Sequence, residues 1–372
     1  MSLVALLDIG SARVSGVLIS PTADFPQILF TTDIPVILPD KADTDRFFKD
    51  VAEAAKEVLK NLIKSGHGAP KQTICFLSAP FYASRTNVFS KKEAGSFVCS
   101  QKLLDSLIEK EIKDFPGHEI LESSILTIYL NGYRVDSPIG QQTQEIEFSH
   151  YLSIASAPVL TQLRQAISGV VHLSSIQFHS SAFVFFQVLD SLTAINKNYL
   201  ALNFNGEISE LSLIWRNALR ETVSFPLGED WLIRELAQML KTTPEEGYSI
   251  LRAYQSAHIN KAMEKTLAEA LEKLRPVWLA AFHEALNRAL ANSFLPRELF
   301  LLGKVGLSPI IKQWLETESW QNLMLGDGNL AVKIIDPVIF ASLYNRIPQN
   351  SDLATLVEII FCDTMLKHVS RH

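Results

Sequence analysis

Three residues near the start of the chain, Asp8, Gly10 and Ser11, have the types and the spacing of a phosphate-binding turn. They follow the apolar segment 3–7, and a second segment rich in apolar residues, 13–20, comes directly after them. Glycine lets the backbone approach an anion closely, and a carboxylate at the end of a strand suits a magnesium ion or its water. An ordinary hairpin with a Gly-Ser turn has the same pattern. Taken alone, the pattern leaves both interpretations open.

A weaker copy of this arrangement occurs in the second half of the chain. The apolar segment 199–202 leads to Asn203, a turn follows that contains Gly206, and residues 210–215 are again mostly apolar. Each half therefore begins with a strand, a polar residue, a glycine-containing turn and a second strand. We expect two lobes that start alike.

The segments between these turns predict a mixed α/β protein whose first lobe is interrupted. Two segments, 125–130 and 145–154, have the residue pattern of β-strands and are joined through an Asn-Gly turn. This pattern differs from that of the segments around them. The two segments indicate a small α+β module within the first lobe. The expected division is a first lobe in two parts, an inserted subdomain and a second lobe, at 1–78 and 161–196, 79–160, and 197–372.

Helices are expected where apolar residues recur every three or four positions. Residues 45–65 form one such stripe, which Gly66 ends. Residues 261–292 predict either one long helix or two helices broken near Pro276. The last helix, 352–368, is apolar on most faces and has few cations, so we expect it to close the fold by packing on the lobes.

The composition narrows the class of protein without giving a function. The chain has 372 residues, 47% of them apolar and 20% charged, and a net charge of −6. No basic run with interleaved aromatic residues favours nucleic-acid binding. Three distant cysteines suit a reducing compartment, the scattered histidines favour no metal site, and neither a signal peptide nor a membrane-spanning stretch is evident. We expect a cytoplasmic protein without a direct membrane anchor.

The order of elements resembles that of the actin-like ATPase superfamily, in which two similar lobes bind a nucleotide between their hairpin turns. Within it the chain is most similar to the cell-division family FtsA and next to the type IV pilus family PilM. Residues 131–140 resemble a family segment that ends in Asn-Pro-Xaa-Gly, and 225–237 resemble the segment that opens a helix of the second lobe. The resemblance implies a duplicated ribonuclease H-like fold with a small α+β insert, ATP with Mg²⁺ as cofactor, and self-association in filaments. It also implies protein partners, either a tubulin-like division protein or pilus assembly proteins.

The chain departs from this family in the second lobe. Asn203 stands where the family has an aspartate, and the neighbouring turn lacks two glycines and carries Glu207 and Ile208. Tyr248 and Leu251 replace a glutamate and a lysine of the family that contact ribose. The residues that the resemblance assigns to nucleotide are Asp8, Gly10, Ser11, Asn203, Gly206 and, in place of a Gly-Gly turn near adenosine, Gly303 and Lys304. Because a phosphate cradle needs most of its donors at once, we expect ATP to bind weakly or not at all.

These observations predict an FtsA-like scaffold with a degenerate nucleotide site, which organises division or envelope machinery through partners at the inner face of the membrane. A PilM-like pilus assembly protein and a weak ATP-binding switch are the alternatives. A small-molecule kinase of the same superfamily is a further one, although kinases need an intact second cradle and a catalytic carboxylate.

Overall fold

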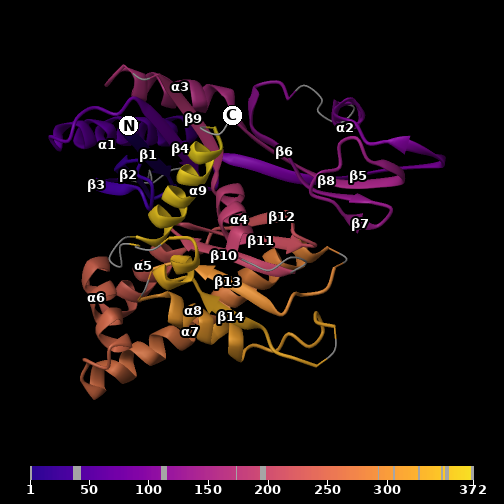
Figure 1. The fold of residues 1–372 in the computed structure, drawn as a ribbon. Helices are drawn as coiled ribbons and strands as arrows, with labels where there is room; N and C mark the ends of the chain where they lie inside the picture. The colour runs from indigo at the N-terminus through magenta and orange to yellow at the C-terminus, as the bar shows by residue number, and fades with distance from the viewer. Residues whose placement is uncertain are drawn as a thin grey trace.

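Three β-sheets organise the fold, which is seen in a computed structural model of the chain. Two sheets of five strands lie one above the other, and a four-stranded sheet projects to one side (Figure 1). The structure describes residues 2–36, 43–109, 115–172, 174–192, 198–291, 293–304, 306–325, 327–344, 347 and 352–369.

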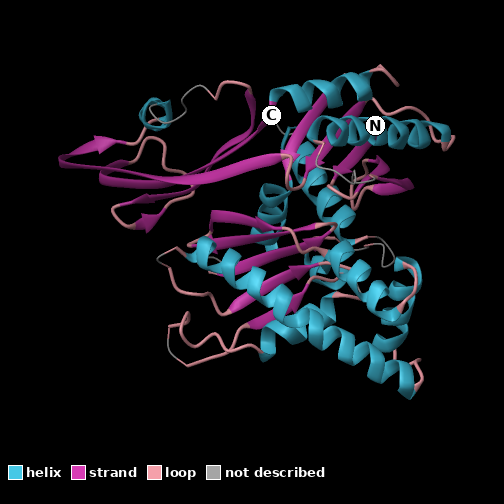
Figure 2. Cartoon of the chain, turned by 180° about the vertical axis from the view of Figure 1, so that it is seen from behind, coloured by secondary structure: helices cyan, strands magenta, loops and turns pink. Residues whose placement is uncertain are grey.

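The sheet of the first lobe has the strand order β3-β2-β1-β4-β9. Its strands are β1 (Val4–Ile9), β2 (Arg13–Ser20), β3 (Gln27–Pro35), β4 (Gln72–Leu77) and β9 (Ser175–Ser180). One face is covered by α1 (Thr44–Lys64) and α3 (Ala157–Ser168), and the other by α4 (Ser181–Leu192) and α9 (Leu353–Val369). Figure 2 shows the two outer helices above the strands.

The sheet of the second lobe has the order β12-β11-β10-β13-β14. Its strands are β10 (Tyr199–Asn205), β11 (Ile208–Trp215), β12 (Ala218–Phe225), β13 (Glu298–Leu302) and β14 (Ala331–Ile334). The further helices of this lobe are α5 (Glu229–Leu240), α6 (Pro244–Gln255), α7 (Lys261–Leu290), α8 (Ser308–Thr317) and the 3₁₀ helix η1 (Pro337–Ser342). α7 continues through Pro276, so the long segment forms one helix and not two.

The two sheets are built alike around their central strands. β1 is antiparallel to β2 and parallel to β4, and β10 has the same relation to β11 and β13. Asp8 pairs with Ser15 across the first hairpin, and Asn203 pairs with Glu210 across the second. The predicted two-lobed α/β fold with a repeated opening is thus confirmed.

The third sheet, which we call the insert, has the order β5-β8-β6-β7 and carries one helix on its face. Its elements are β5 (Tyr82–Val98), α2 (Gln101–Glu109), β6 (His118–Leu130), β7 (Tyr133–Arg134) and β8 (Gln142–Ser156). β5 has 17 residues, and its outer half is polar and shows no apolar period.

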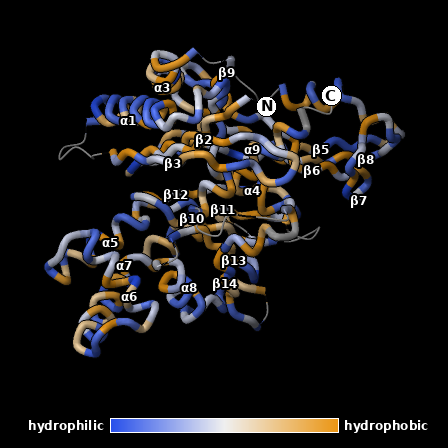
Figure 3. The backbone as a smooth tube through the Cα atoms, turned by 60° about the vertical axis from the view of Figure 1, so that its left-hand side comes forward, coloured by the Kyte–Doolittle hydropathy of each residue, from blue (hydrophilic) through white to orange (hydrophobic). Residues whose placement is uncertain are grey.

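One apolar core is shared by both lobes and by α9. It contains Phe76 from β4, Tyr199 from β10, Phe300 from β13 and Ile359 from α9. In Figure 3 the central strands and α9 are mostly hydrophobic, whereas α1 turns a hydrophilic face outward. α9 therefore packs inside the fold, as its sequence predicts. Among the described residues, no helix is long and apolar enough to cross a membrane.

Candidate functional site

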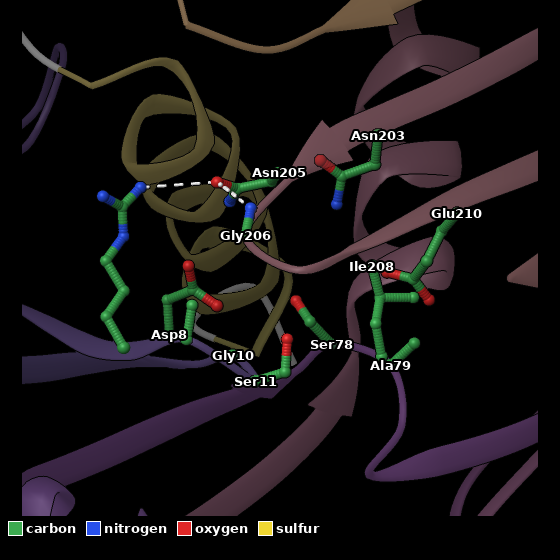
Figure 4. Close-up of a pocket in the computed structure, with 12 residues that line it drawn as sticks. Asp8, Gly10, Ser11, Ser78, Ala79, Asn203, Asn205, Gly206, Ile208 and Glu210 are labelled. Atoms are coloured by element: carbon green, nitrogen blue, oxygen red, sulfur yellow. Dashed lines mark hydrogen bonds between the residues drawn. The ribbon is translucent and has the colours of Figure 1, made fainter. Parts of the chain in front are cut away.

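The two hairpin turns face each other across the cleft between the lobes (Figure 4). Asp8, Gly10 and Ser11 come from the β1–β2 turn, and Asn203 and Gly206 come from the β10–β11 turn. All five line one cavity of about 20 Å³. A space of this size holds about one water molecule. The structure therefore brings these predicted residues together, but around a very small space.

The two turns approach each other so closely that one added methyl group would bridge them. A methyl group placed on Gly206 would lie 3.7 Å from the Ala12 Cβ and 3.7 Å from the Ser11 Oγ, which is ordinary van der Waals contact. The Arg13 guanidinium crosses the cleft and donates to the Asn205 Oδ1 at 3.3 Å. The same oxygen accepts from the Gly206 backbone N–H at 3.0 Å. These contacts close the cleft from both sides.

The backbone donors at the start of α5 are also used within the lobe. The N–H of Gly228 donates to the Glu207 carbonyl at 3.0 Å, and the N–H of Asp230 donates to the Gly206 carbonyl at 2.9 Å. A Cβ on Gly228 would lie only 2.3 Å from that Gly206 oxygen, so this approach requires glycine. Helix N-termini bind anions through such free N–H groups. Here the turn's own carbonyls occupy two of them.

Gly303 and Lys304 lie beside this site, and together with Asn203 and Glu229 they line a second cavity of about 10 Å³. The Lys304 ammonium is 2.9 Å from the Glu229 carboxylate and 3.7 Å from that of Asp230. Its backbone N–H donates to Glu229 Oε1 at 2.5 Å. The lysine thus neutralises a fully buried carboxylate of its own lobe and does not extend toward Asp8.

α9 enters between the lobes and brings the carboxyl group of Glu358 to the cleft. Asp8 and Glu358 line a common cavity of about 20 Å³, whose other walls are mostly apolar. Burial raises the pKa of Asp8 to about 7, against the opposing charge of Arg13. Burial and the charge of Asp8 raise the pKa of Glu358 well above its usual value. Burial also raises the pKa of Glu229, against Lys304. The raised pKa values favour the protonated, uncharged forms of these carboxyl groups, which are weaker ligands for a magnesium ion than carboxylates are.

The residues expected near ribose offer no sugar contact. Leu251 is completely buried in the core of the second lobe. Tyr248 packs at the edge of that core, with its ring centre 6.0 Å from the Lys304 ammonium. In the parts of the chain that the structure describes, no group of three His, Cys, Asp or Glu side chains could hold a metal ion. In this arrangement the residues present do not fit magnesium-bound ATP.

Several residues that shape the cleft were not predicted from the sequence. They are Arg13, Tyr82, Glu210, Glu229 and Glu358. Glu358 carries a signal that could have found it, because it is a lone carboxylate among the apolar residues of 353–362. Glu229 directly follows Gly228 within the family-like segment 225–237, and the other three have no such signal.

Comparison with known proteins supports the fold and leaves the role open. No protein-family model matches the sequence, and no curated protein is similar to it in sequence. A chain of the PilM–PilN type IV pilus biogenesis complex matches with a TM-score of 0.56 and 16% identity, over 96% of this chain and 94% of that one. The ethanolamine utilization protein EutJ from Carboxydothermus hydrogenoformans matches with a TM-score of 0.47 and 11% identity, over 97% and 90% of the chains. Apo ParM of pSK41 gives a TM-score of 0.41 and 9% identity, over 100% and 99%. With its two matching sheets, the chain has the two-lobed fold of the actin-like ATPases.

Proposed function

We propose that this protein is a non-enzymatic scaffold built on the actin-like fold, which binds protein partners and does not turn over ATP. The observation that carries this proposal is the closed cleft, in which Arg13, Lys304 and Glu358 stand where a nucleotide and its magnesium would be expected. Hydrogen bonds within the chain already occupy the backbone N–H of Gly10 in the first turn and that of Gly206 in the second. Binding of ATP would have to break these contacts before it gained its own.

The similarity to the PilM chain supports a partner from type IV pilus assembly. The matched complex contains PilN, and the match extends over nearly the full length of both chains. We therefore infer that the partner is a pilus assembly protein at the inner face of the membrane, and that attachment to the membrane comes through it. An FtsA-like role with a tubulin-like division protein is the alternative.

Calorimetric titration with ATP and Mg²⁺ tests the scaffold proposal. A site with a millimolar Kd adds only about 0.4 kcal/mol of stability at 1 mM ligand, so we expect no measurable heat and no shift in Tm. The same titration of Asp8→Ala is the matched control and should be indistinguishable. A micromolar Kd, or ATP hydrolysis that Asp8→Ala abolishes, would contradict the proposal.

A binding assay with purified partners separates the two scaffold roles. The full chain is mixed with a PilN-type pilus protein or with a tubulin-like division protein, and complex formation is followed by light scattering. We expect a complex with the pilus protein alone. Binding of the division protein alone would replace the PilM-like role by the FtsA-like one, and binding of neither would count against both.

One observation keeps the ATP-binding switch as a second candidate. A groove of about 390 Å³ opens beside the cleft and is lined by Arg13, Lys304, Asp33 and Asp352. It is large enough for a small ligand, unlike the cavities between the turns. A ligand there would sit next to the site instead of between the turns, and the ATP titration described above would detect it.

A further inference from the structure

We infer that the insert is a strap that fixes the two lobes in one arrangement. The insert leaves the first lobe through β5, and β5, β6 and β8 all contact β12 of the second lobe. Figure 1 shows these long strands running out above β11 and β12. The insert therefore joins the lobes along its length, at three places described below.

The first attachment lies at the root of the insert, beside the cleft. The Tyr82 hydroxyl of β5 donates to the Glu210 Oε1 of β11 at 2.6 Å. The other oxygen of Glu210 accepts from the Ser181 hydroxyl of α4 at 2.8 Å. Glu210 is only 4% exposed, and it also accepts a backbone hydrogen bond from Ala79, so loss of the Tyr82 hydroxyl would remove one of several hydrogen bonds that this buried carboxylate receives across the lobes.

The second and third attachments follow further along the strands. The Thr86 hydroxyl of β5 donates to the Leu219 carbonyl of β12. The Tyr129 hydroxyl of β6 donates to the Arg216 carbonyl at 3.2 Å, and the Arg216 guanidinium lies 4.4 Å from the centre of the Tyr129 ring. The same guanidinium is 3.4 Å from the carboxylate of Glu147 in β8.

The turn that receives the third attachment is the tight turn of the β11–β12 hairpin. Arg216 and Asn217 have φ angles of 54° and 59°, in the left-handed region that residues with side chains seldom adopt. Two such angles in succession form the two-residue hairpin turn between β11 and β12. Asn198 accepts the N–H of Arg216 at 2.7 Å, and the Asn217 amide donates to Asp190 of α4 at 3.2 Å. The turn is thus held by contacts with both the insert and the first lobe.

Because of these attachments, the lobes can rotate apart only if the insert moves with the second lobe or if its contacts with β12 break. A partner that bends the insert away from the second lobe would loosen the cleft, and a partner that binds across insert and second lobe would hold it closed. The inference concerns the chain itself and holds whichever partner it binds.

Three native cysteines provide probes for this inference, because each is completely buried in a different core. Cys362 of α9 lies in the core shared by the lobes, Cys75 in the outer core of the first lobe, and Cys99 in the core of the insert. A thiol reagent labels a buried cysteine only when its core opens. The labelling rate of each cysteine therefore reports the opening of one part.

The test removes the three hydroxyls of the strap without changing side-chain shape, in the variant Tyr82→Phe/Thr86→Val/Tyr129→Phe. Loss of three hydrogen bonds should raise the labelling rate of Cys362 on the order of 100-fold, and that of Cys75 by much less. The control, Tyr133→Phe/Thr143→Val, makes the same kinds of substitution at insert positions away from the attachments: Tyr133 is exposed, and the Thr143 hydroxyl bonds within the insert. It should leave the rate of Cys362 near that of the wild type.

An unchanged rate of Cys362 in the first variant would overturn the inference, since the shared core alone would then hold the lobes. A parallel rise of Cys362 and Cys75 would also overturn it, because it would report a general loss of stability. If the triple variant does not fold, Tyr129→Phe/Glu147→Gln, which alters only the far attachment, replaces it. That pair should raise the rate of Cys362 on the order of 10-fold, and no rise would count against the strap.

Discussion

The buried carboxyl of Asp8 makes a sharp prediction about stability and pH. Its pKa is about 7 in the folded protein against an ordinary value of 3.8, because burial disfavours the charged form more than Arg13 favours it. The folded state therefore binds this proton more tightly than the unfolded state does. Its contribution to stability is complete below pH 3.8, falls as the pH rises, and is lost above about pH 7.

The size of the effect follows from the shift in pKa. Each pKa unit corresponds to about 1.4 kcal/mol, so ionisation of Asp8 costs the folded protein up to roughly 4 kcal/mol at pH 8. Asp8→Asn keeps the shape of the side chain and cannot ionise. Relative to the wild type, this variant should gain stability as the pH rises from 4.5 to 8, by roughly 2 to 4 kcal/mol.

Urea unfolding at a series of pH values measures this difference directly. The control is Asp105→Asn, a substitution of an exposed aspartate on α2, whose unfolding free energy should follow that of the wild type at every pH. The reasoning is refuted if the curves of Asp8→Asn and of the wild type run parallel from pH 4.5 to 8. Parallel curves would mean that Asp8 ionises freely in the fold and remains available for a magnesium ion.

Three further predictions concern the contacts that close the cleft. Lys304→Met should lower the free energy of unfolding by about 3 to 5 kcal/mol, because it leaves the buried Glu229 carboxylate unpaired. In urea unfolding, the double variant Lys304→Met/Glu229→Gln should recover most of this loss. Gly228→Ala should lower stability by about 1 to 3 kcal/mol through a clash with the Gly206 carbonyl, whereas Gly95→Ala, which has open space around it, should have little effect on Tm. Asn203→Asp/Ile208→Thr restores two residues of the family pattern, yet ATP affinity by calorimetry should improve less than about tenfold, because the cavity between the turns remains near 20 Å³. A micromolar Kd would contradict this prediction.

Much of the fold could be predicted because it depends on local patterns. The equivalence of Asp8 and Asn203 is visible as two strand-and-turn segments, and the structure places them in the same register of two sheets. The closure of the cleft depends on pairs that are distant in the sequence, such as Lys304 with Glu229 and Tyr82 with Glu210. Their choice of partner follows from the packing of whole lobes. The spacing and periodicity of residues predict which residues lie on each turn, but they do not predict the distance between the turns.

The return of α9 to the first lobe has a consequence for the order in which the chain folds. The face of β1 and β4 that carries Leu6 and Phe76 is covered partly by α9, whose residues are synthesised after every strand of the second lobe. While the ribosome is still making the second lobe, that apolar face lacks part of its cover. The first lobe emerges before the second lobe and waits for α9 to cover this face. We therefore expect chaperones to bind the first lobe for longer than they bind the second lobe during synthesis.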